Sequence, residues 1–199
     1  LGQVAHFDTL AALSLSQLQQ LLPADIRILQ LAEVAVDFHA RYSAIANIYS
    51  YHLQLKRSPF FTNYRYFYPT TSLPFLQLKA SILEGKHDFT SFANNGGTKT
   101  SPIKENYKIQ VIKTYDGICL SFLGSGFLYK MVRSIVGSLI DNKMDEKLLQ
   151  QALTAKARSY TSAAAPAKGL FLNEVIYSQG RFEECLRNFR NDKYEDLAQ

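Results

Sequence analysis

The sequence is poor in sulfur-containing residues and contains no tryptophan: its 199 residues include two cysteines and two methionines. Cys119 and Cys185 are far apart, so they provide neither a disulfide framework nor a zinc-ligand spacing. Isolated thiols of this kind favour a reducing compartment, and we expect a cytoplasmic protein. No apolar run approaches the roughly 18 residues of a membrane-spanning helix, and no signal-peptide pattern is seen. We therefore expect no membrane partner.

Complete catalytic motifs are also missing. There is no glycine-rich phosphate loop that continues into Lys-Ser or Lys-Thr, and no Gly-x-Ser-x-Gly elbow. Gly124-Ser125-Gly126 lacks the remaining glycine and the helix context of a dinucleotide fingerprint. No two histidines have the helical i,i+4 spacing of metal ligands, so each is interpreted as a structural histidine, and no metal is predicted. The histidines are His6, His39, His52 and His87.

The composition is that of an ordinary globular protein, with 47% apolar, 20% charged and 13% aromatic residues. The length suffices for one sizeable core, with room for two lobes. A net charge of +5 and a pI near 9.1 fit a polyanionic partner. A basic surface with aromatic residues points weakly to looped or single-stranded RNA.

The hydrophobic patterns predict an α+β fold with a largely antiparallel sheet. Residues 49–56 alternate cleanly between apolar and polar, and Asp116-Gly117 joins two strand-like runs as a hairpin. Ser14 and Gln17 form a capping box before a short helix. Further strands are predicted at 4–7, 25–38 and 170–177, and further helices at 72–85, 131–140 and 145–157. The charged segment from Arg181 is compatible with a helix.

The stretch Gly126–Gly137 organises the chain, because it reads as a strand that runs directly into a helix. Arg133 falls at the edge of the apolar stripe of that helix. An arginine at such an edge can hold a carboxylate or phosphate partner, because its guanidinium is always charged and presents a rigid fork of donors. The alternative is a boundary arginine whose head reaches solvent.

Six phrases in order resemble the tRNA pseudouridine synthase A family, over the first 177 residues. They are Leu1-Gly2-Gln3-Val4-Ala5-His6-Phe7, Asp37-Phe38-His39-Ala40-Arg41-Tyr42-Ser43-Ala44, Tyr49-Ser50-Tyr51, Gly85-Lys86-His87-Asp88-Phe89-Thr90-Ser91-Phe92, Phe127-Leu128-Tyr129-Lys130-Met131-Val132-Arg133-Ser134-Ile135-Val136-Gly137 and Ala165-Pro166-Ala167-Lys168-Gly169-Leu170. Each phrase alone is weak, but their order and spacing make the resemblance specific.

The resemblance implies a tRNA pseudouridine synthase, an isomerase that converts uridine to pseudouridine in the anticodon stem–loop of tRNA. It implies a homodimer, no cofactor, and a mostly antiparallel mixed sheet with helices on one side. It also implies that residues 1–40 are the remainder of an N-terminal subdomain and that 41–180 form the C-terminal pseudouridine-synthase subdomain. A charged tail then covers 181–199.

The family's catalytic aspartate belongs to an Arg-Thr-Asp-Ala-Gly-Val-His phrase that precedes the Gly-Gln-Val segment. This sequence begins at Leu1 and does not contain that phrase. We therefore expect either a shortened chain or further residues ahead of Leu1, and we expect the 199 residues alone to be inactive.

By the same resemblance, Arg133 is the partner of that aspartate, and Tyr49 stacks on the flipped uracil and helps to remove its C5 proton. Leu128 would form an apolar wall beneath the base. From the alternation alone, Tyr49 is more simply a core tyrosine, and Leu128 can equally be an ordinary core leucine. The candidates for phosphate or loop contacts are His39, Arg41, Lys104 and Lys130.

The sequence departs from the family at two positions that bear on RNA affinity. Asn47 stands where the family often has a basic residue, and Lys104-Glu105 replaces the usual Arg-Thr. Two alternatives to an isomerase remain, a non-catalytic RNA-binding module and a dimerisation domain.

Overall fold

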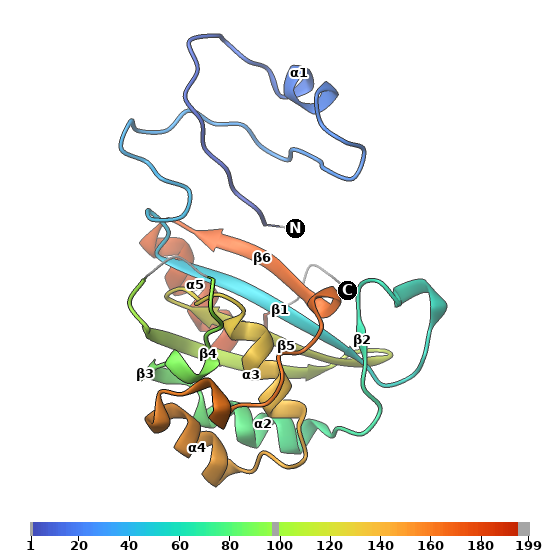
Figure 1. Cartoon of the computed structure of the whole chain (residues 1–199). Coiled ribbons are helices and arrows are strands. Elements are labelled where there is room, and N and C mark those ends of the chain that lie inside the picture. The colour runs from blue at the N-terminus through green and yellow to red at the C-terminus, as the bar shows by residue number, and fades with distance from the viewer. Residues whose placement is uncertain (1, 97–99, 195–199) are drawn as a thin grey trace. The chain divides into compact units, whose positions relative to one another are not determined.

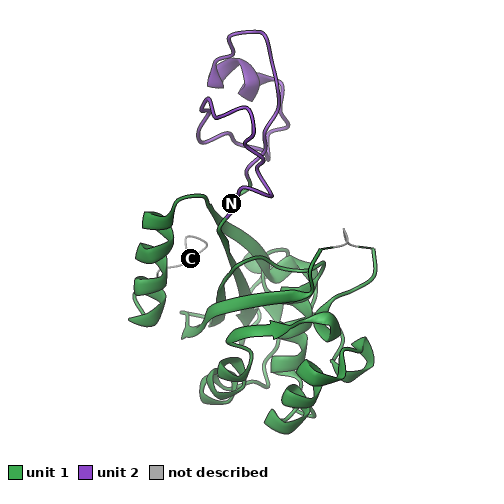
Figure 2. Cartoon of the chain, turned by 90° about the vertical axis from the view of Figure 1, so that its left-hand side faces the viewer, with its two compact units in different colours: residues 1–3, 45–199 green, residues 4–44 purple. Residues whose placement is uncertain are grey.

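The computed structural model describes residues 2–96 and 100–194. The chain divides into two compact units (Figure 2). Residues 1–3 and 45–199 form the first unit, and residues 4–44 form the second. Among the described residues, no helix has both the length and the apolar character needed to cross a bilayer.

The first unit is built on a six-stranded sheet with the order β2-β1-β5-β4-β3, in which β6 also pairs with β1 (Figure 1). The β1–β2 pair is parallel, whereas β1–β5, β1–β6, β4–β5 and β3–β4 are antiparallel. The predicted α+β class with a mostly antiparallel, mixed sheet is confirmed. The strands are β1 (Ala46–Gln54), β2 (Tyr66–Phe67), β3 (Gly85–Asp88), β4 (Ile103–Lys113), β5 (Gly117–Gly124) and β6 (Leu170–Ile176).

Strand β1 forms where the alternation predicted it, but both of its faces are covered. Tyr51 and Leu53 enter the larger core on one face, while Ile48 enters a smaller core on the other. His52 is also buried on that second face, with its ring edge-on to Phe171 at 5.3 Å. A polar residue on a strand is therefore not always on a solvent face, because side chains cover both faces of β1.

Three helices cover one face of the sheet, namely α2 (Leu73–Ile82), α3 (Met131–Ile140) and α4 (Glu146–Ala155). The fifth helix, α5 (Gln179–Arg190), packs through Cys185 and Phe189 on the smaller core of the opposite face (Figures 1 and 2). Short 3₁₀ helices complete this unit at Pro59–Phe61 (η1), Thr90–Phe92 (η2), Arg158–Tyr160 (η3) and Ala167–Gly169 (η4).

A buried lysine joins α2 to the end of α3. Lys79 has no exposed surface, and its Nζ donates to the carbonyl oxygens of Leu139 at 2.6 Å and Asp141 at 3.1 Å. The same Nζ lies 4.3 Å from the centre of the Phe75 ring. Burial lowers the pKa of Lys79 to about 8, although the carboxylates of Asp141 and Asp145 oppose that shift. The lysine thus satisfies carbonyls that the end of a helix leaves without partners.

The second unit contains one helix, α1 (Leu15–Gln20), with the predicted capping box at Ser14. The strands predicted at 4–7 and 25–38 are wrong, since no strand is assigned within residues 4–44. No residue of this unit is buried, and Val36 is fully exposed. An alternating segment needs a neighbouring strand and an apolar face to pack on, and the described residues of this unit supply neither.

The segment that forms the second unit leaves and rejoins the first unit at one strand. The amide of Gly2 donates to the carbonyl oxygen of Leu172 at 2.7 Å, and the amide of Ile45 donates to that of Ile176 at 2.8 Å. Gly2 approaches β6 so closely that a Cβ there would lie 2.2 Å from the carbonyl oxygen of Asn173. The residues that flank 4–44 on both sides, Gly2 and Ile45, are therefore hydrogen-bonded to β6.

Candidate active site

The loop before α3 is fixed by its backbone. Lys130, the N-cap residue of α3, has a left-handed conformation with φ of 59°, and the amide of Met131 donates to the carbonyl oxygen of Leu128 at 3.0 Å. The amide of Asn94 donates to the carbonyl oxygen of Tyr129 at 3.1 Å. The Asn94 side chain in turn accepts a hydrogen bond from the Ser134 hydroxyl at 3.2 Å. The start of α3 is therefore held against the loop that follows η2.

Arg133 joins α3 to the loop that precedes β6 through two hydrogen bonds. Its Nε donates to the carbonyl oxygen of Ala165 at 2.7 Å, and the amide of Ala165 donates to the carbonyl oxygen of Arg133 at 2.9 Å. The residue is half-buried. Within residues 2–96 and 100–194, its terminal nitrogens have no hydrogen-bond or ion-pair partner. One nitrogen therefore orients the guanidinium, and the other two remain available for a carboxylate or phosphate.

A glycine lets this loop lie directly on α3. A Cβ at Gly137 would be 2.0 Å from the carbonyl oxygen of Ala163, much closer than any real contact allows. The backbone of the loop at Ala163 therefore lies against the backbone of α3 at Gly137, one helical turn after Arg133. This close approach keeps the carbonyl oxygen of Ala165 within hydrogen-bond distance of the Arg133 Nε.

Tyr51 binds the same loop from the sheet. Its ring is fully buried, and its hydroxyl donates to the carbonyl oxygen of Pro166 at 2.7 Å. Gly169 packs on the ring, where a Cβ would lie 2.8 Å from two ring carbons. Burial, and to a smaller extent Tyr66, raise the pKa of Tyr51, whereas the positive charge of Arg133 lowers it. Arg133 and Tyr51 thus hold neighbouring carbonyls of one loop and interact electrostatically.

Tyr49 and Leu128 lie at the edge of the core. Both are half-buried and pack against the larger core. The Tyr49 ring meets Phe127 edge-on, with centroids 5.2 Å apart and an interplanar angle of 79°. Tyr49 shares a strand face with Tyr51, since the two are separated by one residue of β1. A half-buried ring of this kind retains surface that a nucleobase could contact.

Two of the four predicted basic contacts lie near the Gly126–Gly137 stretch. The Nζ of Lys104 would be 3.7 Å from a Cβ at Gly126, and the Nζ of Lys130 lies 5.2 Å from the centre of the Tyr129 ring.

The other two candidates, His39 and Arg41, belong to the second unit. The His39 ring lies between those of His6 and Tyr42, with centroids at 4.4 and 4.3 Å, and its Nδ1 accepts from the amide of Arg41 at 3.1 Å. These two residues therefore form a local cluster of their own.

Sequence reasoning overlooked Tyr51 and the carbonyls of Ala165 and Pro166. The alternation did place Tyr51 on the same face as Tyr49, but it gave no reason to prefer either tyrosine. The carbonyls carry no side-chain signal at all. No set of three or more His, Cys, Asp or Glu side chains within the described part of the chain is placed to hold a metal ion.

Residues 80–178 match the model of the tRNA pseudouridine synthase family. The tRNA pseudouridine synthase A 1 of Protochlamydia amoebophila is 40% identical over 189 residues, which cover 88% of this chain and 74% of that protein. The tRNA pseudouridine synthase A of Chlamydia felis is 39% identical, with 88% and 70% covered. That of a Geobacillus species is 37% identical, with 88% and 75% covered.

The chain belongs to the tRNA pseudouridine synthase A family.

The segment that matches the family model includes the whole Gly126–Gly137 stretch and the Ala165–Leu170 loop. It therefore contains Arg133 together with the carbonyl that orients it. The family resemblance found in the sequence is therefore confirmed.

Proposed function

We propose that this chain catalyses, or forms the receiving half of a site that catalyses, the isomerisation of uridine to pseudouridine in the anticodon stem–loop of tRNA. The reaction breaks the bond between C1′ of the ribose and N1 of uracil, and forms a bond between C1′ and C5. C5 then loses its hydrogen as a proton, and N1 gains one. No electrons leave the base, so the reaction requires no redox cofactor.

The proposal rests on the guanidinium of Arg133, whose Nε has a hydrogen-bond partner and whose terminal nitrogens have none among the described residues. The carbonyl oxygen of Ala165 accepts from Nε at 2.7 Å, so the guanidinium has a fixed direction and both of its terminal NH₂ groups are open. An aspartate bound there would accept two charge-assisted hydrogen bonds, which would lower its pKa and keep it ionised. We assign that carboxylate to the family's Arg-Thr-Asp-Ala-Gly-Val-His phrase, which residues 1–199 do not contain.

We assign the base itself to Tyr49 and Leu128. A uridine must leave its stack before C1′ and C5 can be reached, and stacking on an aromatic ring offsets part of that cost. Tyr49 is half-buried, so one part of its ring packs on Phe127 while the rest can meet a base. Lys104 and Lys130 would contact phosphates nearby. His39 and Arg41 are separate candidates for tRNA contacts, within the second unit.

We further propose a cytoplasmic homodimer. Both cysteines are free thiols and are buried, which suits a reducing compartment. The second unit exposes large apolar side chains such as Leu10, Leu29 and Val36, and a monomer rarely leaves so many uncovered. Sedimentation with and without tRNA would measure the self-association.

The test uses tRNA transcripts that carry tritium at C5 of uridine, because each turnover releases that label to water. The protein is a chimera in which the segment of the Protochlamydia amoebophila enzyme that ends with its aspartate phrase precedes Leu1. We expect tritium release from the chimera, and none from the 199 residues alone. Arg133→Ala should abolish release, whereas the matched control Arg187→Ala, an exposed arginine on α5, should leave it unchanged.

The outcomes separate the alternatives. Equal release by the chimera and its Arg133→Ala variant would refute the role given to Arg133. Salt-sensitive tRNA binding without any release by the chimera would instead favour a non-catalytic RNA-binding module.

A further inference from the structure

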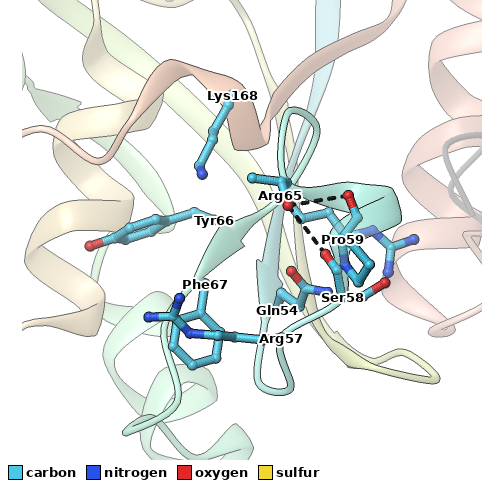
Figure 3. Close-up of a pocket in the computed structure, with 9 residues that line it drawn as sticks. Gln54, Arg57, Ser58, Pro59, Arg65, Tyr66, Phe67 and Lys168 are labelled. Carbon is cyan, nitrogen blue, oxygen red and sulfur yellow. Dashed lines mark hydrogen bonds between the residues drawn. The ribbon is translucent and has the colours of Figure 1, made fainter.

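A pocket of about 400 Å³ lies at the end of β1, beside β2 and η1 (Figure 3). Its size is at the lower end of the range for ligand sites in proteins. The residues assigned above to the isomerisation do not line it. The side chains that decide its chemistry are Gln54, Arg57, Arg65, Tyr66, Phe67 and Lys168.

The pocket is positively charged. Arg57, Arg65 and Lys168 reach it from three separate segments, and no acidic side chain lines it among the described residues. Arg65 is neutralised by an ion pair with Asp116, so its charge is already used. Arg57 and Lys168 are exposed and have no hydrogen-bond or ion-pair acceptor in the described parts of the chain. The pocket therefore has two cations to offer an anion.

An aromatic wall accompanies these charges. The guanidinium of Arg57 lies over the Phe67 ring, 4.5 Å from its centroid, and Tyr66 also lines the pocket (Figure 3). The stacking holds the Arg57 guanidinium beside the pocket without consuming its hydrogen-bond donors. Cations beside aromatic faces suit a nucleotide, because its phosphate and its base need different partners.

A buried amide adds an unsatisfied group. Gln54 is 2% exposed, lines the pocket, and its Nε2 has no hydrogen-bond partner. A buried amide without a partner is costly, and an acceptor inside the pocket would remove that cost. The NH₂ group of Gln54 has two N–H donors for such an acceptor.

The pocket adjoins the Tyr51 contact through one short loop. Lys168 lies between Pro166, which accepts the Tyr51 hydroxyl, and Gly169, which packs on the Tyr51 ring. Lys168 therefore belongs to the same loop whose Ala165 carbonyl oxygen accepts the Arg133 hydrogen bond. An RNA bound at the candidate site has neighbouring nucleotides, one of which could occupy the pocket. A free metabolite is not joined to the target uridine in this way.

We propose that this pocket binds a phosphate-bearing nucleotide of the tRNA substrate, close to the target uridine. Arg57 and Lys168 hold the phosphate, the Gln54 amide donates to it or to the sugar, and the wall of Tyr66 and Phe67 supports the base. The inference depends on the proposed function only for the identity of the RNA.

The test measures binding of a fluorescein-labelled anticodon stem–loop RNA to the 199-residue chain by anisotropy, as a function of salt. Each lost phosphate contact lowers the slope of log K against log[salt] by about 0.7 to 0.9. Because Arg57 and Lys168 share one phosphate, we expect Arg57→Gln with Lys168→Gln to lower the magnitude of that slope by about 0.7 to 0.9 and to weaken binding by about tenfold. Both side chains are exposed, so the variant should keep the wild-type melting temperature and circular dichroism.

The matched control is Lys147→Gln with Arg187→Gln, because these exposed residues lie on α4 and α5 and carry the same charges. The control should bind RNA as the wild type does. An unchanged slope in the pocket variant, or an equal loss in the control, would overturn the proposal.

A second arm separates RNA from a free anion. Inorganic phosphate and uridine monophosphate are tested by equilibrium dialysis at micromolar concentration, and we expect no stoichiometric binding. Stoichiometric binding that the pocket variant loses would show a free-anion site and overturn the RNA assignment. Failure of the isomerase proposal is distinct, because it is read from tritium release by the chimera and not from RNA affinity.

Discussion

Replacement of Lys79 by methionine should change how the stability of this protein depends on pH. The lysine is fully buried in the fold, and its pKa is lowered from 10.5 to about 8, mainly by burial. In the unfolded chain the pKa returns to about 10.4. Between these two values the unfolded state binds the proton more tightly than the folded state does. The free energy of unfolding therefore rises with pH in this window.

The size of the effect follows from the gap between the two pKa values. One pKa unit corresponds to about 1.4 kcal/mol, so the rise is on the order of 1 kcal/mol per pH unit near pH 9 and has a ceiling of roughly 3 kcal/mol. Cys185 acts in the opposite direction. Burial raises its pKa from 9.0 to about 11, so ionisation of the unfolded thiol lowers stability above about pH 9. The difference between wild type and the Lys79→Met variant cancels this second contribution.

Urea unfolding followed by far-ultraviolet circular dichroism, at steps from pH 7 to pH 10, measures that difference; the absence of tryptophan makes this signal preferable to fluorescence. The wild type should gain stability relative to Lys79→Met between pH 8 and pH 10. Lys147→Met, at an exposed position on α4, should show no such trend. A difference between wild type and Lys79→Met that stays flat within about 0.3 kcal/mol over this window would refute the argument.

Three further substitutions test the site, and two of them have a matched control. Gly137→Ala should cost about 3 kcal/mol or more of stability in urea unfolding, because its Cβ would lie 2.0 Å from the carbonyl oxygen of Ala163. Gly180→Ala on α5, which meets nothing within 4 Å, should instead stabilise by about 0.5 to 1 kcal/mol, and equal effects at both glycines would contradict the geometry. Tyr51→Phe should cost about 1 kcal/mol through loss of the bond to Pro166, while Tyr115→Phe, at a fully exposed position, should cost nothing measurable in the same titration. Arg133→Lys in the chimera should keep the fold but lower kcat/KM for tritium release by about 10 to 100-fold, because an ammonium cannot reproduce the fork; retained activity would argue against bidentate binding of a carboxylate.

The sheet was predictable from local patterns wherever a strand has its partner close by in the sequence. The Asp116-Gly117 signal gave the β4–β5 hairpin, in which Lys113 pairs with Ile118. The same reasoning failed within residues 25–38, where the pattern is equally apolar but no strand forms. Alternation shows what a segment can bury, and the presence of a partner decides whether it does so.

The candidate site was only partly predictable. Helical spacing placed Arg133 at the edge of the α3 stripe, but nothing in that spacing specified Ala165 as the residue that orients it. This contact spans 32 positions and involves a backbone carbonyl. The pocket beside β2 was missed for a similar reason, since Arg57 and Lys168 are ordinary loop cations until the fold brings them together.

The attachment of residues 4–44 at a single strand has a consequence for protein engineering. Its two anchoring carbonyls, on Leu172 and Ile176, are four strand positions apart, which is about 13 Å. A linker of about six residues can span that gap, so the whole excursion is replaceable by a short bridge. Shortening the loop about sevenfold would lower the entropy cost of its closure by roughly 1.5 to 2 kcal/mol. The product would be a minimal domain that retains the complete sheet together with Arg133 and its loop.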